Sequence, residues 1–376
     1  MRSCRRPVRN ALQIFLIVAA LAPAPAARGS AETRAEEANM PYRQEEVLIL
    51  NDGIKLAGTL TRPESGGPFG AVVLLQGSGP VNRDEEAFGW KPFRVLADHL
   101  TRSGWAALRF DSRGVGGSEG TAYAYGLPDV ASDALAAVRY LRSRPDIESQ
   151  RIGLCGHSQG GIVAPLCAAQ SGEISFIICL SGTGLPGDAN FFAQQKAVSR
   201  AEGATEAEWQ ADLGDLREFV ALIRSGAERA DLEPVVRAMV SRQIDELTAV
   251  RDPALGQSSA ELQSKVDCIL SGYDTPWFRS FLEHDPRPAL EKVTCPVLLV
   301  FGGLDLQVPA EENRKAMVRA LLQGGHSDFS VRTFPGANHL FQAAVTGSPA
   351  EYGRLSKEFV PGFLDLISGW ISLRSR

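Results

Sequence analysis

The sequence predicts an α/β fold, in which a mostly parallel β-sheet carries helices on both faces and a helical insertion interrupts the alternation. Short apolar runs such as "GAVVLLQGSG" and "CPVLLVFGG" alternate with longer segments in which apolar residues recur three and four positions apart. The central stretches of these runs, "AVVLL" and "VLLVF", are apolar at every position, which is typical of strands buried on both faces of a parallel sheet. Between residues 184 and 290 the strand-like runs disappear and only helical spacing remains.

The strands and helices are expected in a regular order. "EEVLIL" and "IKLAGTLTRP" predict an antiparallel pair joined by a turn at Asn51, Asp52 and Gly53. The next segments predict strand "GAVVLLQGSG", helix "PFRVLADHLTRSG", strand "WAALRFD", helix "DVASDALAAVRYLRSR", strand "RIGLC", helix "GIVAPLCAAQ" and strand "ISFIICLSG". After the insertion come strand "CPVLLVFGG", helix "PAEENRKAMVRALLQ", strand "FSVRTF" and helix "LSKEFVPGFLDLISGWISL". Repeated β-α-β units of this kind indicate a parallel sheet.

The chain is expected to divide into a core, formed by residues 44–183 and 291–376, and an insertion formed by residues 184–290. Segments such as "EAEWQADLGDLREFVALIRSG" and "DLEPVVRAMVSRQIDEL" are typical of amphipathic helices. Open parallel sheets bind ligands at the carboxyl ends of their strands. We therefore expect the insertion to form a helical cap over those ends. The alternative is a separate domain docked elsewhere on the core.

Residues 1–31 have the pattern of a secretory signal peptide. "MRSCRRPVRN" carries four arginines, and "ALQIFLIVAALAPAPAA" follows as an apolar stretch that ends in small residues. The apolar part is short for a membrane span, and an uncleaved anchor is the alternative interpretation. We expect a secreted or periplasmic protein with no stable membrane span after processing.

Charge and cysteine content limit the partners that the sequence predicts. The chain of 376 residues has a net charge of -5, and loss of the arginine-rich leader would change it to -10. Such an acidic protein has no evident attraction to nucleic acid or to anionic membranes. The six cysteines form no C-x-x-C pair, so we expect buried thiols and no metal site, with a disulfide through Cys268 left open.

The pattern G-x-S-x-G, typical of a nucleophilic serine on a strand-to-helix turn, occurs twice. Around Ser118 it follows "RGVGG" and precedes "TAYAYGLPD", neither of which predicts a buried strand or a helix start. Around Ser158 it follows the apolar run "RIGLC" and precedes "GIVAPLCAAQ", which has helical spacing. Ser158 is therefore the predicted nucleophile, with a structural turn serine as the alternative, and Ser118 is predicted to be a loop serine.

A serine hydroxyl needs a base that takes its proton and an acid that orients the base. His339, in "FPGANHLF", follows the last predicted strand in a loop at the carboxyl edge of the sheet. Asp305, in "LLVFGGLDLQVP", lies just past the strand before it. The order Ser158, Asp305, His339 predicts a catalytic triad. Asp188 is the rival acid, and a turn or capping role is the alternative for Asp305.

The negative oxygen formed during attack on a carbonyl needs two N–H donors that already point at it. Gln159, directly after the serine, is expected to supply one backbone donor, and Ser78 in "LLQGSGPVNRD" the other, with Gly77 and Gly79 allowing close approach. Four charged residues near these loops are expected to form polar brackets that hold them, rather than to bind substrate: Arg83, Asp84, Asp111 and Arg113.

The set "GSGPVNRD", "FDSRGVGGSEG", "GHSQGG", "GGLDLQVP" and "GANHLF" resembles the bacterial α/β-hydrolases of the esterase and serine aminopeptidase-like group, over residues 45 to 373. The resemblance implies an α/β-hydrolase fold, Ser158, Asp305 and His339 as the triad, and ester hydrolysis through an acyl-enzyme. One departure is Gln76, which stands where many relatives have a histidine. Neither the residues nor the resemblance indicates a metal or an organic cofactor.

The favoured function is that of a serine carboxylesterase acting on a small-molecule ester. A peptidase or aminopeptidase acting on short peptides would use the same triad, and a non-catalytic binding protein would not require all three residues. In "YDTPWFRSFLEHDP", Trp277, Phe278 and Phe281 either anchor the cap to the core or form a wall of the acyl pocket. A wall this bulky predicts a preference for short acyl groups.

Overall fold

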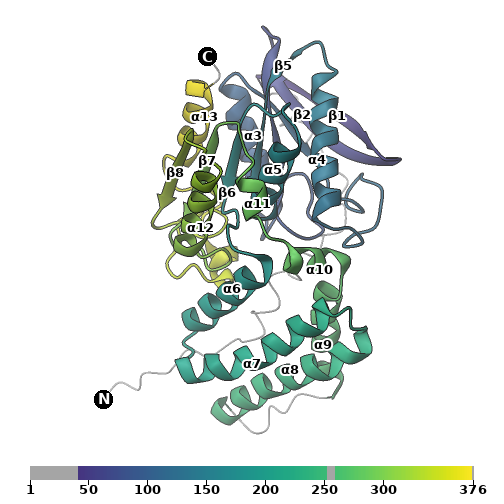
Figure 1. Cartoon of the computed structure of the whole chain (residues 1–376), viewed down its shortest axis with the longest axis vertical. Coiled ribbons are helices and arrows are strands. Elements are labelled where there is room, and N and C mark those ends of the chain that lie inside the picture. Colours follow the sequence, from purple (N-terminus) through teal and green to yellow (C-terminus); the bar gives the residue numbers. More distant parts are fainter. Residues whose placement is uncertain (1–40, 252–258, 375–376) are drawn as a thin grey trace.

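The computed structural model describes residues 41–251 and 259–374, with the backbone alone described for residues 243–251. The predicted signal peptide, residues 1–31, lies outside the described residues. An eight-stranded sheet forms the centre of the molecule, with strand order β1-β2-β4-β3-β5-β6-β7-β8 (Figure 1). The strands are β1 (Tyr42–Asn51), β2 (Ile54–Pro63), β3 (Phe69–Leu75), β4 (Ala106–Phe110), β5 (Ile147–His157), β6 (Ile177–Leu180), β7 (Val297–Gly302) and β8 (Phe329–Phe334).

The sheet is mostly parallel, as the alternating pattern predicted. The leading hairpin is antiparallel and turns between Asn51 and Ile54, and β2 continues the antiparallel pairing onto β4. From β4 to β8 every neighbouring pair is parallel. All residues of β3, β4, β6 and β7 are buried, because helices cover both faces of the sheet.

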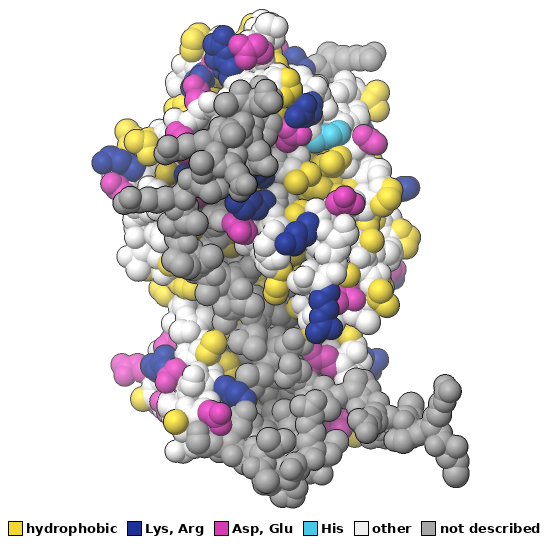
Figure 2. Space-filling model, turned by 180° about the vertical axis from the view of Figure 1, so that it is seen from behind, with side chains coloured by type: hydrophobic (Ala, Val, Ile, Leu, Met, Phe, Trp, Pro, Cys, Tyr) yellow, Lys and Arg dark blue, Asp and Glu magenta, His cyan; other side chains and the backbone are white. Residues whose placement is uncertain are grey.

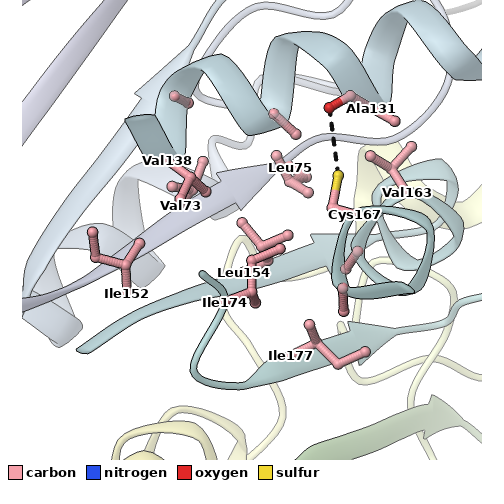
Figure 3. Close-up of a cluster of buried hydrophobic side chains, with 14 of the residues drawn as sticks. Val73, Leu75, Ala131, Val138, Ile152, Leu154, Val163, Cys167, Ile174 and Ile177 are labelled. Atoms are coloured by element: carbon pink, nitrogen blue, oxygen red, sulfur yellow. Dashed lines mark hydrogen bonds between the residues drawn. The ribbon is translucent and has the colours of Figure 1, made fainter. Parts of the chain in front are cut away.

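Two apolar layers sandwich the sheet. On one face lie α4 (Leu127–Arg142), α5 (Gln159–Gln170), α11 (Arg287–Leu290) and α12 (Ala310–Gln323). On the other lie α3 (Pro92–Arg102) and α13 (Phe363–Arg374). Figure 3 shows part of the first layer, in which Val163 and Cys167 of α5 belong to one apolar cluster and the Cys167 thiol points toward α4 and donates to the Ala131 carbonyl at 3.5 Å. This packing holds α5 against the sheet and against α4.

Between β6 and β7 the chain forms helices α6 (Gly187–Ala201), α7 (Glu206–Arg224), α8 (Arg229–Arg251), α9 (Ser259–Tyr273) and α10 (Pro276–Glu283). They share one buried apolar cluster, and α7, α8 and α9 gather at one end of the molecule (Figure 1). Helix α10 contacts the core directly, since the Leu127 N–H donates to Ser280 Oγ at 3.0 Å. None of the described helices is long and apolar enough to cross a bilayer.

One predicted element begins later than expected. The last helix was predicted from Leu355, but α13 begins at Phe363. Pro361 and Gly362 precede it, and Gly362 has a φ of 80°, a left-handed value that ends any helix before it. A short 3₁₀ helix, η2 (Pro349–Arg354), ends directly before the predicted start at Leu355. On the face shown in Figure 2, charged side chains of both signs are interspersed over the described surface.

Candidate active site

Ser158 occupies the sharp turn between β5 and α5. Its φ of 53° is a value that non-glycine residues adopt at a cost of about 1–3 kcal/mol. The turn is packed tightly on both sides of the serine. A Cβ atom on Gly156 would lie 2.0 Å from the Gly160 carbonyl oxygen, and one on Gly160 would lie 2.0 Å from the Leu75 carbonyl oxygen. The glycines of the motif are therefore required by close backbone contacts, and the turn holds the serine in a strained conformation at the start of α5.

The second G-x-S-x-G match has a different environment. Ser118 lies in the loop after β4, where its hydroxyl donates to the Asp111 carbonyl at 2.8 Å and accepts from the Ala57 N–H at 3.0 Å. Both partners are backbone groups, so this hydroxyl holds a loop in place. Ser118 does not line the cavity described below.

His339 and Asp305 form a buried pair. The Asp305 Oδ2 atom lies 2.8 Å from His339 Nδ1, and each residue is only 4% exposed. The other carboxylate oxygen, Oδ1, accepts from the N–H groups of Gln307 and Val308, each at 2.9 Å. These two bonds orient the carboxylate toward the imidazole. The rival acid, Asp188, instead lies on α6 and accepts from Arg224 at 2.7 Å.

A cavity of about 510 Å³ lies between the sheet and the inserted helices. Its lining includes Ser78, Ser158, Gln159, His339 and the three aromatics predicted from the sequence, Trp277, Phe278 and Phe281. These seven residues follow four different strands, β3, β5, β6 and β8, and the fold brings them to one place. Within the described structure no hydrogen bond joins the side chains of Ser158 and His339.

Two backbone N–H groups beside Ser158 are available as donors. Gln159 is the first residue of α5, where an N–H has no acceptor inside the helix. Ser78, in the loop after β3, also lines the cavity, and its N–H likewise has no acceptor among the described residues. Gln76 does not contribute, because its buried amide donates to the Phe110 carbonyl at 2.9 Å and to Ser112 Oγ at 3.0 Å. Neither donor of the predicted oxyanion site is thus hydrogen-bonded to another described residue.

Trp277 connects the inserted helices to the residue after the serine. Its indole N–H donates to the side-chain oxygen of Gln159. The Trp277 ring stacks on Phe281 with centroids 5.8 Å apart, whereas Phe278 makes edge contacts with Phe191 and Tyr273 at 5.4 and 4.6 Å. Trp277 therefore lies at the boundary between core and insertion, and Phe278 belongs mainly to the apolar cluster of the inserted helices.

The predicted polar brackets form, with partners that sequence did not specify. The Arg83 side chain donates to both carboxylate oxygens of Asp111, at 3.2 and 2.8 Å. Asp84 accepts from Arg109, and Arg113 donates to Asp133. The carboxylate of Asp111 also accepts from the N–H groups of Arg83 and Gly117, so it joins the loops after β3 and β4.

A second acid–histidine pair, which was not predicted from the sequence, lies at the site. Glu85 Oε1 lies 2.7 Å from His157 Nδ1, and His157 Nε2 lies 2.9 Å from the His339 carbonyl oxygen. Burial acts to lower the pKa of His157, but Glu85 and the His339 carbonyl oppose it and the net pKa is raised. Glu85 is separated from His157 by 72 positions, and the quoted motif "GSGPVNRD" stops one residue short of it. The contribution of η2, including Tyr352, to the lining of the cavity was not predicted from the sequence either.

The chain matches a family model described as the alpha/beta hydrolase family over residues 72–352. It is 26% identical to Esterase EstD of Thermotoga maritima over 335 residues, which cover 88% of this chain and 68% of that protein. Two solved structures share the fold: a hypothetical protein PA2218 from Pseudomonas aeruginosa (TM-score 0.53, 16% identity, 94% of this chain and 99% of that one) and the Pyrococcus furiosus esterase Pf2001 (TM-score 0.51, 16% identity, 93% and 95%). The chain belongs to the alpha/beta hydrolase family.

Proposed function

We propose that this protein is a serine carboxylesterase that cleaves short-acyl esters through a covalent acyl-enzyme. The observation that carries the proposal is the meeting, in one cavity, of a strained turn serine, a buried Asp–His pair and two unoccupied backbone donors. A relative named as an esterase supports the same chemistry. Export through a cleaved leader remains part of the proposal.

The proposed reaction begins at Ser158. As Oγ attacks the carbonyl carbon of the ester, its proton passes to His339 Nε2, while Asp305 holds Nδ1–H and stabilises the positive charge of the ring. The carbonyl oxygen becomes negative and accepts from the Ser78 and Gln159 N–H groups. His339 then returns the proton to the departing alcohol. The hydrogen bond between serine and histidine is expected to form when substrate binds, as such bonds often tighten only then.

Water completes the cycle. His339 accepts a proton from a water molecule, whose oxygen attacks the acyl carbon, and the intermediate collapses with return of the proton to Ser158 Oγ. The products are a carboxylic acid and an alcohol, and the enzyme returns to its starting state.

The preference for short acyl groups rests on Trp277. The acyl carbon must approach Ser158 while its oxygen lies near the Gln159 N–H. The Trp277 ring is held to the side chain of that same residue, so it bounds the space beside the reacting carbon. The volume of about 510 Å³ leaves room for a larger alcohol group elsewhere in the cavity.

One observation weighs against an aminopeptidase. A free substrate amine would need an unpaired carboxylate in the lining, and the only acid among the described lining residues is Glu85. That carboxylate already contacts His157 and the Gly77 N–H. We therefore expect esters to be cleaved in preference to aminoacyl amides.

The test is a panel of nitrophenyl esters of increasing acyl length beside aminoacyl nitroanilides. Ser158→Ala should abolish ester hydrolysis and covalent labelling by a fluorophosphonate, with an unchanged melting temperature, because it removes the nucleophile but little packing. Ser118→Ala is the matched control and should retain both. Labelling that persists in Ser158→Ala and disappears in Ser118→Ala would show that the nucleophile is misassigned.

A further inference from the structure

A buried ion pair that the proposed reaction does not use lies directly beneath the site. Glu85 and His157 are 6% and 5% exposed, and they contact each other through Glu85 Oε1 and His157 Nδ1 at 2.7 Å. The same carboxylate oxygen accepts from the Gly77 N–H at 2.6 Å. Gly77 precedes the proposed oxyanion donor Ser78, so Glu85 holds the oxyanion loop as well as the histidine.

The hydrogen-bond partners determine where the protons of this pair are. A carbonyl oxygen only accepts, so His157 Nε2 must carry a proton to bond the His339 carbonyl at 2.9 Å. A second proton must then lie between Nδ1 and the carboxylate. The negative charge of Glu85 stabilises this doubly protonated, positively charged ring relative to the neutral imidazole, which has only one N–H. His157 can therefore donate to Glu85 and to the His339 carbonyl at once only in this doubly protonated state, which the carboxylate favours.

The loop that carries Glu85 is itself constrained. Glu85 has a φ of 54°, a costly value for a non-glycine residue, and its N–H donates to the Asn82 carbonyl at 2.9 Å. The two residues before it are tied to the sheet through the pairs Arg83–Asp111 and Asp84–Arg109. The carboxylate is thus delivered by a rigid segment, as expected of a group that sets the position of others.

We propose that Glu85 and His157 form a positioning pair that fixes the oxyanion loop and the His339 loop relative to Ser158. Three segments meet at the pair: Gly77 after β3, His157 at the end of β5, and His339 after β8. The pair does not touch the reacting atoms. It sets the distance between the proposed oxyanion donor and the proposed base, which otherwise belong to loops separated by more than half of the chain. The inference rests on the proposed function for its effect on turnover.

Glu85→Gln tests the proposal because it retains the shape of the side chain and removes its charge. The atom in the place of Oε1 is then either an amide oxygen, which keeps the Gly77 N–H but leaves the neutral imidazole one donor short, or an NH₂ group, which donates to Nδ1 but opposes the Gly77 N–H. In either case one of the contacts made by the pair is lost. We expect kcat for a nitrophenyl ester to fall about 10- to 100-fold, less than the ~10²- to 10³-fold loss caused by removing an oxyanion donor, with KM within about twofold. Asp133→Asn is the matched control, since Asp133 is equally buried and pairs with Arg113 away from the cavity.

His157→Phe gives an independent variant, because it retains a ring but removes both ring contacts. If the two residues act as one unit, the double variant Glu85→Gln/His157→Phe should lose about as much kcat as the stronger single variant. Additive losses, a change in KM alone, or a kcat loss in Asp133→Asn as large as in Glu85→Gln would overturn the proposal. If Glu85→Gln does not fold, the kcat and KM of His157→Phe decide.

A measurement that needs no substrate separates this proposal from the proposed function. Single-residue hydrogen exchange should show the Gly77 amide at least about tenfold more protected than the adjacent Ser78 amide, for which the described part of the chain offers no acceptor. The difference should shrink in Glu85→Gln/His157→Phe. Equal exchange of the two amides in the unmodified protein would overturn the positioning role, whether or not any ester is cleaved. Loss of esterase activity from the unmodified protein alone would count only against the proposed function.

Discussion

Replacing Asp305 by Asn is expected to remove catalysis while leaving the fold intact. Asp305 Oδ1 accepts from two backbone N–H groups, and Oδ2 faces His339 Nδ1. In Asp305→Asn, the amide oxygen keeps its place beside Gln307 and Val308, because the flipped orientation would set an NH₂ group against two N–H donors. The NH₂ group then faces His339 Nδ1 and donates to it, which forces the ring proton onto Nε2.

That tautomer cannot accept the proton of Ser158, so turnover should fall about 10⁴-fold, or ~5 kcal/mol in the barrier. All three hydrogen bonds of the side chain survive, and the melting temperature should therefore change little. Asp305→Ala leaves the two backbone donors without an acceptor and should cost about 1–3 kcal/mol of folding free energy for each. The contrast between the two variants separates the catalytic effect from the structural one.

The assay is kcat/KM for a short nitrophenyl ester, with melting curves for each variant. Asp188→Asn is the control, because Asp188 pairs with Arg224 on the inserted helices and makes no contact with His339. Retention of more than about a tenth of the activity in Asp305→Asn would refute the tautomer argument. An equal loss in Asp188→Asn would assign the acid to the preceding strand.

Two further predictions concern the aromatics and the buried histidine. Trp277→Ala should move the preferred acyl length upward in the nitrophenyl ester panel. Phe278→Ala should instead cost about 3–5 kcal/mol of folding free energy, measured by denaturant unfolding, and leave the preferred acyl length unchanged. A change of acyl preference in Phe278→Ala but not in Trp277→Ala would contradict the geometry. His157 faces Glu85, Asp305 and the His339 ring, and its pKa is raised in the folded protein. Protonated His157 therefore contributes its full stabilisation below about pH 6.5, the pKa in the unfolded chain, and this stabilisation is lost as pH rises through the pKa in the folded protein. Melting temperature should therefore fall with pH above that point more steeply in the unmodified protein than in Glu85→Gln, and parallel curves would exclude this linkage.

Much of the core could be predicted because its pattern is local. The runs that became β3 and β7 are apolar at every position, and only a sheet covered on both faces buries them. Prediction erred at the last helix, where the apolar spacing after Leu355 suggested an earlier start. Local backbone chemistry at Pro361 and Gly362 overrides that spacing, and the helix begins only at Phe363.

The candidate site divides in the same way. Ser158, Asp305 and His339 could be placed because each follows a recognisable strand, and the ends of parallel strands meet at one edge of the sheet. The contact between His157 and the His339 carbonyl spans 182 positions, and no periodicity in the sequence relates the two. The same holds for Trp277 and Gln159, which are 118 positions apart.

By itself the sequence determined the class of fold, the strand-to-helix turn around Ser158 and the order of the three candidate residues, because hydrophobic periodicity and glycine requirements act over a few neighbouring positions. Only the tertiary structure decided which acids pair with which bases: Asp305 with His339, Glu85 with His157, and Asp188 with Arg224. Side-chain pairing depends on burial and on distances of about 3 Å between groups far apart in the chain. Those distances exist only after the strands and helices have packed together.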